Sequence, residues 1–200
     1  MAAGGGSTLR QRQHERTRGD VVRAALRLIA ANGTRGMTID GIVSEAGISR
    51  GTLYAHFPDG QGDVVRAAYD QLGEEVLASG AARAALHDDW IGRLTAHAEA
   101  MVDLAEEPEL GFFYNISGPG RLGLDHQSGV GSRGHRAVFH DELAAAQRDG
   151  RIPADIDVAA TALLMVGMMR QTGIDVARDS SLGPRCLGAF RAILAALARR

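Results

Sequence analysis

The sequence predicts an all-α protein with a small N-terminal helix-turn-helix head, a larger helical body and about nine helices in total. Three observations lead to this prediction. Apolar residues recur at helical spacing along most of the 200 residues, and no stretch alternates with a period of two. Aromatic residues, which fill strands, make up only 4% of the chain. With 45% apolar and 23% charged residues, the chain is expected to fold around a core of its own.

The first helix is expected between residues 17 and 31. Its apolar side chains recur on one face, and Asn32-Gly33 follows as a stop signal because glycine takes the left-handed conformation at little cost. The apolar face consists of Val21, Val22, Ala25, Leu26 and Ile29.

Two short helices joined by a tight turn are expected next. Thr38 is placed to N-cap a helix that ends near residue 46, and Gly47 makes the turn. Ser49 is placed to cap the following helix, which must end just before Pro58 because the residue before a proline avoids helical angles.

Six further helices are predicted in the body, at about 63–82, 88–105, 107–116, 132–149, 154–178 and 183–198. Seven glycines between Gly111 and Gly134 predict one long loop, of the kind that is often mobile or functional. The expected organisation is a flexible tail over 1–9, a helix-turn-helix domain over 10–62, and a larger helical domain over 63–200.

Charge is distributed unevenly along the chain. Residues 1–57 carry eight arginines and four acidic residues, whereas residues 58–200 carry fourteen arginines and twenty acidic residues. A basic head on an acidic body is typical of a DNA-contacting protein.

The single Cys186 excludes a disulfide scaffold and suits a reducing cytoplasm. We favour a small buried residue over a reactive thiol at this position. No apolar run reaches the length of a membrane span, and no signal peptide is visible, so we expect a cytoplasmic protein.

The third helix has the residues that a DNA-reading helix needs at its N-terminus. Base edges in the major groove are approached by short or hydrogen-bonding side chains, and Ser49, Gly51 and Thr52 fit that requirement. Arg50 can donate two parallel hydrogen bonds to a guanine, and Thr52 can contact a thymine or a phosphate.

Farther along the same helix, the pattern predicts backbone contacts and packing. Tyr54 and His56 are placed to donate hydrogen bonds to phosphates, which fixes register without reading sequence. Leu53 and Phe57 are expected to point into the core of the head.

Several motifs stand at a fixed spacing in residues 17–57. They are Thr17-Arg18, AALRLIAANG (24–33), Thr38, Ile42 and EAGISRGTLYAHF (45–57). In these motifs the chain resembles the TetR family of bacterial transcriptional repressors. The resemblance implies that this segment is the DNA-binding head, that Tyr54 and His56 contact phosphates, and that the body dimerises and binds a small-molecule inducer.

The chain departs from the family pattern in two places. The family usually carries a lysine soon after the His-Phe pair, whereas residues 58–63 (PDGQGD) contain no base, so the head is expected to depend more on Arg18 and backbone amides. Gly41 replaces a polar residue and weakens the second helix by up to ~1 kcal/mol. The expected DNA-binding residues are Arg18, Thr38, Ser49, Arg50, Gly51, Thr52, Tyr54 and His56.

The last two predicted helices are apolar on more than one face. The segment 158–169 is apolar nearly all round, and the final helix carries Leu194 and Phe190 with alanines on its other faces. A helix of this kind must be covered on both sides, either within one subunit or by a partner. We expect a homodimer in which these helices form a four-helix bundle, and hence a pseudo-palindromic double-stranded DNA operator.

Most aromatic residues fall in the middle of the body. Aromatic and methionine side chains there are expected to line an apolar cavity below the head, although such residues are more often plain core when each is taken singly. Because that lining holds no cation, the expected inducer is apolar and neutral or weakly charged. The expected lining residues are Trp90, Leu94, His97, Met101, Phe112, Phe113, Phe139, Met165 and Met169.

Other classes of site and function are less well supported. His126, His135, His140 and Asp141 lack the spacing of a metal site on one helical face, so no metal or cofactor is expected. No G-x-S-x-G motif, phosphate-binding loop or carboxylate pair indicates an enzyme. The alternatives to a ligand-released repressor are a helical dimeric interaction protein with degenerate DNA binding and, last, an enzyme on a helical body.

Overall fold

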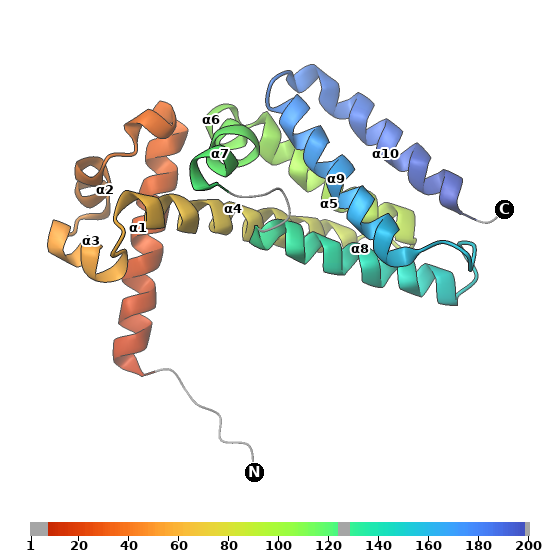
Figure 1. Cartoon of the computed structure of the whole chain (residues 1–200), viewed down its shortest axis with the longest axis horizontal. Coiled ribbons are helices and arrows are strands. Elements are labelled where there is room, and N and C mark those ends of the chain that lie inside the picture. The colour runs from red at the N-terminus through yellow and green to blue at the C-terminus, as the bar shows by residue number, and fades with distance from the viewer. Residues whose placement is uncertain (1–7, 124–128, 199–200) are drawn as a thin grey trace, which may run out of the picture. The chain divides into compact units, whose positions relative to one another are not determined.

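The computed structural model describes residues 8–123 and 129–198, and every regular element in these ranges is helical (Figure 1). The all-α prediction is therefore confirmed. The chain divides into two compact units, residues 1–68 and 69–200, which meet within helix α4 (Gln61–Ala84).

The first unit begins with a longer helix than predicted. Helix α1 (Leu9–Gly36) starts eight residues before Thr17, and Thr8 caps it: Thr8 Oγ1 accepts from the Gln11 amide at 3.2 Å, and the Gln11 side chain accepts from the Thr8 amide at 2.7 Å. The predicted start was wrong because residues 9–16 show no apolar stripe, yet they are strong helix formers behind a capping box. Residues 1–7 of the predicted tail lie outside the described residues. At Gly33, φ of 63° and ψ of −173° interrupt the helix, at the predicted stop.

Helices α2 (Ile39–Ala46) and α3 (Arg50–His56) form the predicted pair. Thr38 Oγ1 accepts from the Gly41 amide at 3.0 Å, and Ser49 Oγ accepts from the Thr52 amide at 3.0 Å. Gly47 makes the turn with φ of 66° and ψ of 36°, a conformation that favours glycine. The core of this unit is fully buried and consists of Val21, Ala24, Ala25, Ile29, Met37, Ile42, Leu53, Phe57, Val64 and Ala68.

The second unit is a set of packed helices (Figure 1). Each predicted body helix exists, with ends within four residues of those predicted. After α4 the elements are α5 (Trp90–Glu106), α6 (Pro108–Phe112), the π-helix η1 (Phe113–Ser117), α7 (Gly118–Leu122), α8 (Val130–Arg148), α9 (Val158–Val176), the 3-10 helix η2 (Ser180–Leu182) and α10 (Gly183–Leu197).

Much of the predicted glycine-rich loop is helical instead. Residues 108–122 form an unbroken series of short helices, and 124–128 lie outside the described residues. Two of the glycines allow close packing: a Cβ on Gly111 would come within 2.5 Å of the Ala105 carbonyl oxygen, and one on Gly118 within 2.7 Å of that of Phe113. The glycines there serve close approach of backbone segments, which composition alone does not distinguish from a loop.

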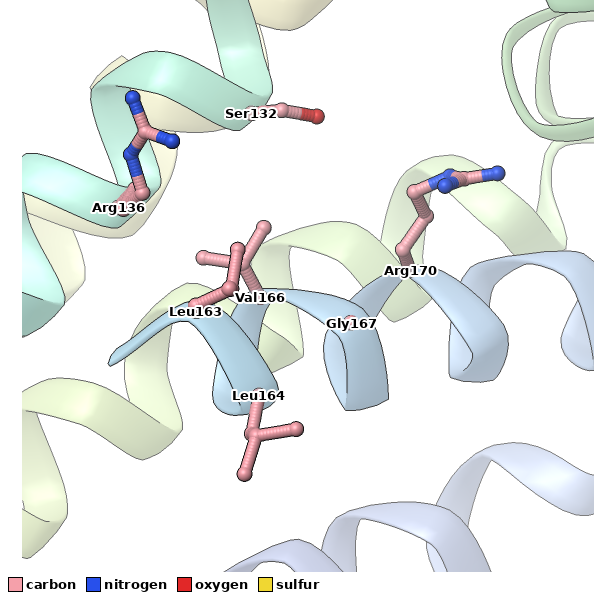
Figure 2. Close-up of a pocket in the computed structure, with 7 residues that line it drawn as sticks. All are labelled: Ser132, Arg136, Leu163, Leu164, Val166, Gly167 and Arg170. Atoms are coloured by element: carbon pink, nitrogen blue, oxygen red, sulfur yellow. The ribbon is translucent and has the colours of Figure 1, made fainter. Parts of the chain in front are cut away.

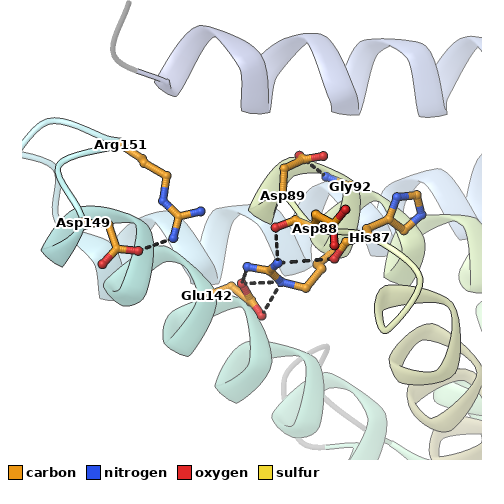
Figure 3. Close-up of polar contacts among 8 residues, drawn as sticks. His87, Asp88, Asp89, Gly92, Glu142, Asp149 and Arg151 are labelled. Atoms are coloured by element: carbon orange, nitrogen blue, oxygen red, sulfur yellow. Dashed lines mark hydrogen bonds and ion pairs between the residues drawn. The ribbon is translucent and has the colours of Figure 1, made fainter.

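Helix α5 is the central helix of this unit. It packs against α8, α9 and α10, and most of its residues are buried. A half-buried ion pair ties it to α8: Arg93 donates to both carboxylate oxygens of Glu142 at 2.8 to 3.0 Å and to the Asp88 carbonyl at 2.9 Å (Figure 3). Hydrogen bonding to Glu142 raises the pKa of Arg93, which favours the charged guanidinium.

Candidate nucleic-acid interface and ligand pocket

The buried inner face of α3 orients the helix so that its outer face is exposed to solvent. Leu53 and Phe57 are four residues apart and fully buried, as predicted, so they fix the orientation of the helix. Ser49, Arg50, Gly51 and Tyr54 are exposed, while Thr52 and His56 are half-buried. The N-terminal end of α3 is therefore accessible to a duplex.

The capping residues keep hydrogens that a phosphate or base can accept. Thr38 is exposed, and its oxygen accepts from the Gly41 amide, which leaves its own hydroxyl hydrogen for another acceptor. The hydroxyl groups of Ser49 and Thr52 lie 2.9 Å apart and bond to each other, so one of the two retains a hydrogen to donate. Thr38, Ser49 and Thr52 are therefore placed where they can contact DNA, and these contacts stay a prediction.

Arg50 has an intramolecular partner that local sequence reasoning missed. Its Nε donates to Asp40 Oδ1 at 2.9 Å, and a terminal guanidinium nitrogen contacts the same oxygen. Both side chains are largely exposed, at 64% for Arg50 and 71% for Asp40. Asp40 lies on α2, ten residues earlier, so no short-range pattern reveals the pair.

Arg18 braces the C-terminal end of α3. One guanidinium nitrogen donates to the His56 carbonyl at 2.8 Å, and the guanidinium lies 4.2 Å from the centroid of the Phe57 ring. This contact caps a helix carbonyl and covers an aromatic face. Arg18 was predicted to contact DNA; its contact with the His56 carbonyl within the head was not predicted.

His56 lies beside a second histidine. The ring centroids of His14 and His56 are 4.1 Å apart. Burial, followed by the nearby His14 and Arg18, lowers the pKa of His56, so the ring is neutral near pH 7. A neutral ring still donates one N–H, as the predicted phosphate contact requires.

The start of α4 carries no base, consistent with the sequence. Asp63 Oδ2 accepts from the Asp59 amide at 2.9 Å, which satisfies an amide at the helix N-terminus. The Gln61 side chain donates to the Met37 carbonyl and ties α4 to the end of α1. The Asp59 amide and the Gln61 side chain are therefore used inside the head.

The predicted ligand residues mostly form a close-packed core. Phe112 is 45% exposed, so its placement in a buried cavity was wrong: it falls on the outer side of the short helix α6. The rings of His97, His135 and Phe139 pack edge to face, with centroids 5.2 to 6.1 Å apart. The eight buried members of the predicted set are Trp90, Leu94, His97, Met101, Phe113, Phe139, Met165 and Met169.

A small cavity lies beside this core. Its volume is about 10 Å³, which is room for about one water molecule rather than an inducer. Met101 and Met169 are the two predicted residues that line it. Its full lining is Tyr69, Met101, Tyr114, Asn115, Gly131, Ser132, His135, Val166, Met169 and Arg170.

A larger pocket lies between α8 and α9, where the sequence reasoning placed none of its ligand residues. Its volume is about 410 Å³, within the range of small-molecule sites. Figure 2 shows Ser132 and Arg136 on α8 above the Val166 and Leu163 side chains of α9, with Leu164 on the opposite side of the α9 ribbon. The lining residues are Ser132, Arg136, Leu163, Leu164, Val166, Gly167 and Arg170.

Metal and membrane sites receive no support from the described ranges. Within residues 8–123 and 129–198, no three histidine, cysteine or acidic side chains converge, and no helix is long and apolar enough to cross a bilayer. His126, one of the histidines weighed as a ligand, lies outside the described residues. Cys186 is half-buried on α10.

Comparisons with known proteins find relatives both for the helix-turn-helix head and for most of the chain. The family model for bacterial regulatory proteins of the tetR family matches residues 21–62. The HTH-type transcriptional regulator SrpR of Pseudomonas putida is 26% identical over 159 residues, covering 78% of this chain and 72% of that protein. The chain therefore carries a TetR-type N-terminal domain, and it is similar over most of its length to an HTH-type transcriptional regulator.

Solved structures of TetR-type regulators share this fold over nearly all of the chain. A TetR-family regulator from Pectobacterium atrosepticum superimposes with a TM-score of 0.78, at 21% identity and covering 95% of this chain and 98% of that one. RolR in complex with resorcinol gives 0.67 at 19% identity, covering 91% and 89%. FadR from Bacillus subtilis in complex with stearoyl-CoA gives 0.65 at 15% identity, covering 86% and 96%.

Proposed function

We propose that this regulator is a homodimeric repressor that binds a pseudo-palindromic operator and is released from it by a small molecule. DNA binding is supported mainly by α3, whose N-terminal end is exposed while its inner face is buried in the head. Direct reading is assigned to Arg50, Ser49 and Thr52, and backbone contacts to Tyr54, His56 and Thr38.

Dimerisation is assigned to the outer faces of α9 and α10. Leu164 is 69% exposed, and Ile193 is 44% exposed. A pocket of about 240 Å³ lies between the two helices, where Met168 and Ile193 line it together with polar side chains such as Asp175. Large exposed apolar side chains on neighbouring helices support a subunit interface. Two heads related by a two-fold axis then require half-sites about 34–36 Å apart, or a multiple of that spacing.

Release by a small molecule is supported by the pocket between α8 and α9 and by the ligands named for RolR and FadR. A ligand that favours a conformation unable to engage both half-sites lowers operator affinity by its differential affinity for the two states, commonly ~1–3 kcal/mol. Because the midsection cavity is so small, the predicted set around Met101 and Met169 can hold a ligand only if helices there move apart.

The decisive experiment retains genomic fragments on the purified full-length protein and sequences them. A repeated inverted motif that the Arg50→Ala variant no longer enriches supports the proposal. Enrichment of no motif by the wild-type protein contradicts it and leaves the alternative of a dimeric interaction protein. Transcription in vitro from a promoter carrying the motif then separates repression from activation.

A further inference from the structure

We propose that His135 recognises the polar group of the inducer: its Nε2 atom accepts a hydrogen bond from the hydroxyl group of a neutral phenolic compound bound at the small inner cavity. This inference rests on the proposed release by a small molecule and names the chemical class of that molecule. It keeps the neutral, mostly apolar ligand that the sequence predicts and adds the group that holds it.

The hydrogen-bonding state of His135 leaves one ring nitrogen as an acceptor. Its Nδ1 lies 2.8 Å from the Gly131 carbonyl oxygen, and a carbonyl only accepts, so the hydrogen is on Nδ1. Burial lowers the pKa of His135, which keeps the ring neutral and Nε2 without a hydrogen. The residue is 1% exposed, and Nε2 has no hydrogen-bond partner among the described residues. Buried acceptors are normally satisfied, and the O–H group of a water or a ligand can satisfy this one.

The cavity that His135 lines is polar and has room for one water molecule, at about 10 Å³. Tyr114 and Asn115 from η1 and Ser132 from α8 also line it. Burial raises the pKa of Tyr114, so its hydroxyl group keeps its hydrogen. Arg170 lines the cavity too, but it already has an interaction partner, so no ligand group is assigned to it. We place a water on Nε2 in the free protein, and the ligand hydroxyl takes the position of that water.

Side chains that suit an aromatic ring border the same cavity. Met101 from α5 and Met169 from α9 line it, and both are buried. Methionine side chains are flexible and make favourable contacts with aromatic rings. The Tyr69 and Tyr114 rings stack in the same wall, with centroids 4.9 Å apart. A phenol combines the ring that these side chains favour with the hydroxyl group that Nε2 accepts.

Space for the ring adjoins the cavity between α8 and α9. Ser132 and Val166 line both the cavity and the groove of about 410 Å³, so a shift of these side chains joins the two spaces. Leu164 lies on the opposite side of the α9 ribbon (Figure 2), on the face assigned to the partner subunit. The ligand is therefore placed on the α8 side of α9, where Val166 is buried, and away from that face.

Calorimetry of the full-length protein with two matched probes tests the assignment. The probes are phenol and anisole, in which a methyl group replaces the hydroxyl hydrogen. We expect phenol to bind at least about tenfold more tightly, because anisole leaves the buried Nε2 acceptor without a donor. Equal binding of the two probes, tighter binding of anisole, or no binding of phenol overturns the proposal.

Variants of His135 separate its acceptor from its packing. His135→Gln keeps a side-chain oxygen that accepts hydrogen bonds, so it should keep most of the preference for phenol. His135→Leu should bind phenol about tenfold more weakly than the wild type and should no longer prefer it over anisole. His140→Gln, at an exposed position of the same helix, is the control and should bind like the wild type. A preference that survives unchanged in His135→Leu contradicts the role of Nε2.

Nitrogen NMR of the histidine rings examines the same atom in the wild-type protein, so this readout does not require that a variant folds. The Nε2 signal of His135 should be that of a ring nitrogen without a hydrogen. It should shift when phenol is added and stay in place when anisole is added. A protonated Nε2, or no shift with phenol, overturns the assignment.

Operator binding by the same samples separates this inference from the proposed function. A protein that binds an operator but shows no preference for phenol keeps its DNA-binding function and loses only the role of His135. Phenol that binds through His135 without weakening operator binding counts against the proposed release, as failure to bind any operator counts against the proposed DNA binding.

Discussion

Replacing Asp40 separates two roles for the ion pair that holds Arg50. In one, Asp40 positions Arg50 for a base; in the other, it occupies the guanidinium until DNA displaces it. The Nε and one terminal nitrogen of Arg50 are engaged by Asp40 Oδ1, and these are atoms that a two-bond contact to guanine uses.

The magnitudes favour the second role. The pair is largely exposed on both sides, so it contributes only about 0.2–1 kcal/mol. A two-bond contact of arginine to guanine contributes about 1–3 kcal/mol of discrimination. The guanine contact therefore outweighs the pair, and DNA can displace Asp40. Asp40 is also an anion beside the phosphate backbone, so Asp40→Asn should raise operator affinity up to about fivefold.

Fluorescence anisotropy with the operator and with single-base variants measures both effects. Arg50→Ala should cost about 1–3 kcal/mol and relax specificity at one position. The double variant Arg50→Ala, Asp40→Asn should bind the operator more tightly than Arg50→Ala only by the contribution of the removed negative charge. A loss of affinity in Asp40→Asn contradicts the displacement argument and makes Asp40 a positioning residue. An Arg50→Ala variant that binds all sequences like the wild type contradicts the reading role.

Three further predictions concern the second unit. Leu164→Arg should leave the subunit folded, because Leu164 is exposed, but should convert a micromolar dimer into a monomer in sedimentation. Arg93→Ala should lower the free energy of unfolding in urea by about 2 kcal/mol, because it leaves the half-buried Glu142 carboxylate without its partner; an unchanged midpoint would contradict this. The free energy of unfolding should fall as pH drops from about 6.5 towards 4, by about 1 kcal/mol per pH unit. The reason is that burial lowers the pKa of His97 to about 4, so the ring takes up its proton only on unfolding. The His97→Leu variant should lose part of this pH dependence, whereas the control His140→Gln, at an exposed position, should keep it.

Features set by neighbouring residues were predictable from the sequence. Thr38, Gly47 and Ser49 each act within four residues of their own position, through a capping bond or a left-handed turn, and the structure confirms all three. The same holds for the buried Leu53 and Phe57, whose spacing of four defines one helical face.

Features that depend on residues far apart in the sequence were not predictable. The groove between α8 and α9 joins Arg136 to Arg170, thirty-four positions later, and exists only because the two helices pack together. The Arg18 contact spans thirty-eight residues. Composition was also misleading where glycines allow close packing, so residues 117–122, beyond the helix predicted over 107–116, were assigned to a loop although they are helical.

The arginines of the head bear on how much of its charge is available to DNA. Arg27 donates to Glu45 at 2.6 Å and joins α1 to α2, while Arg18 joins α1 to α3 and Arg50 joins α3 to α2. The planar guanidinium suits such bridging contacts better than an ammonium group. Three of the eight arginines in residues 1–57 thus hold the three helices together before any DNA is bound. Counterion release on operator binding should therefore be smaller than the charge of the head implies.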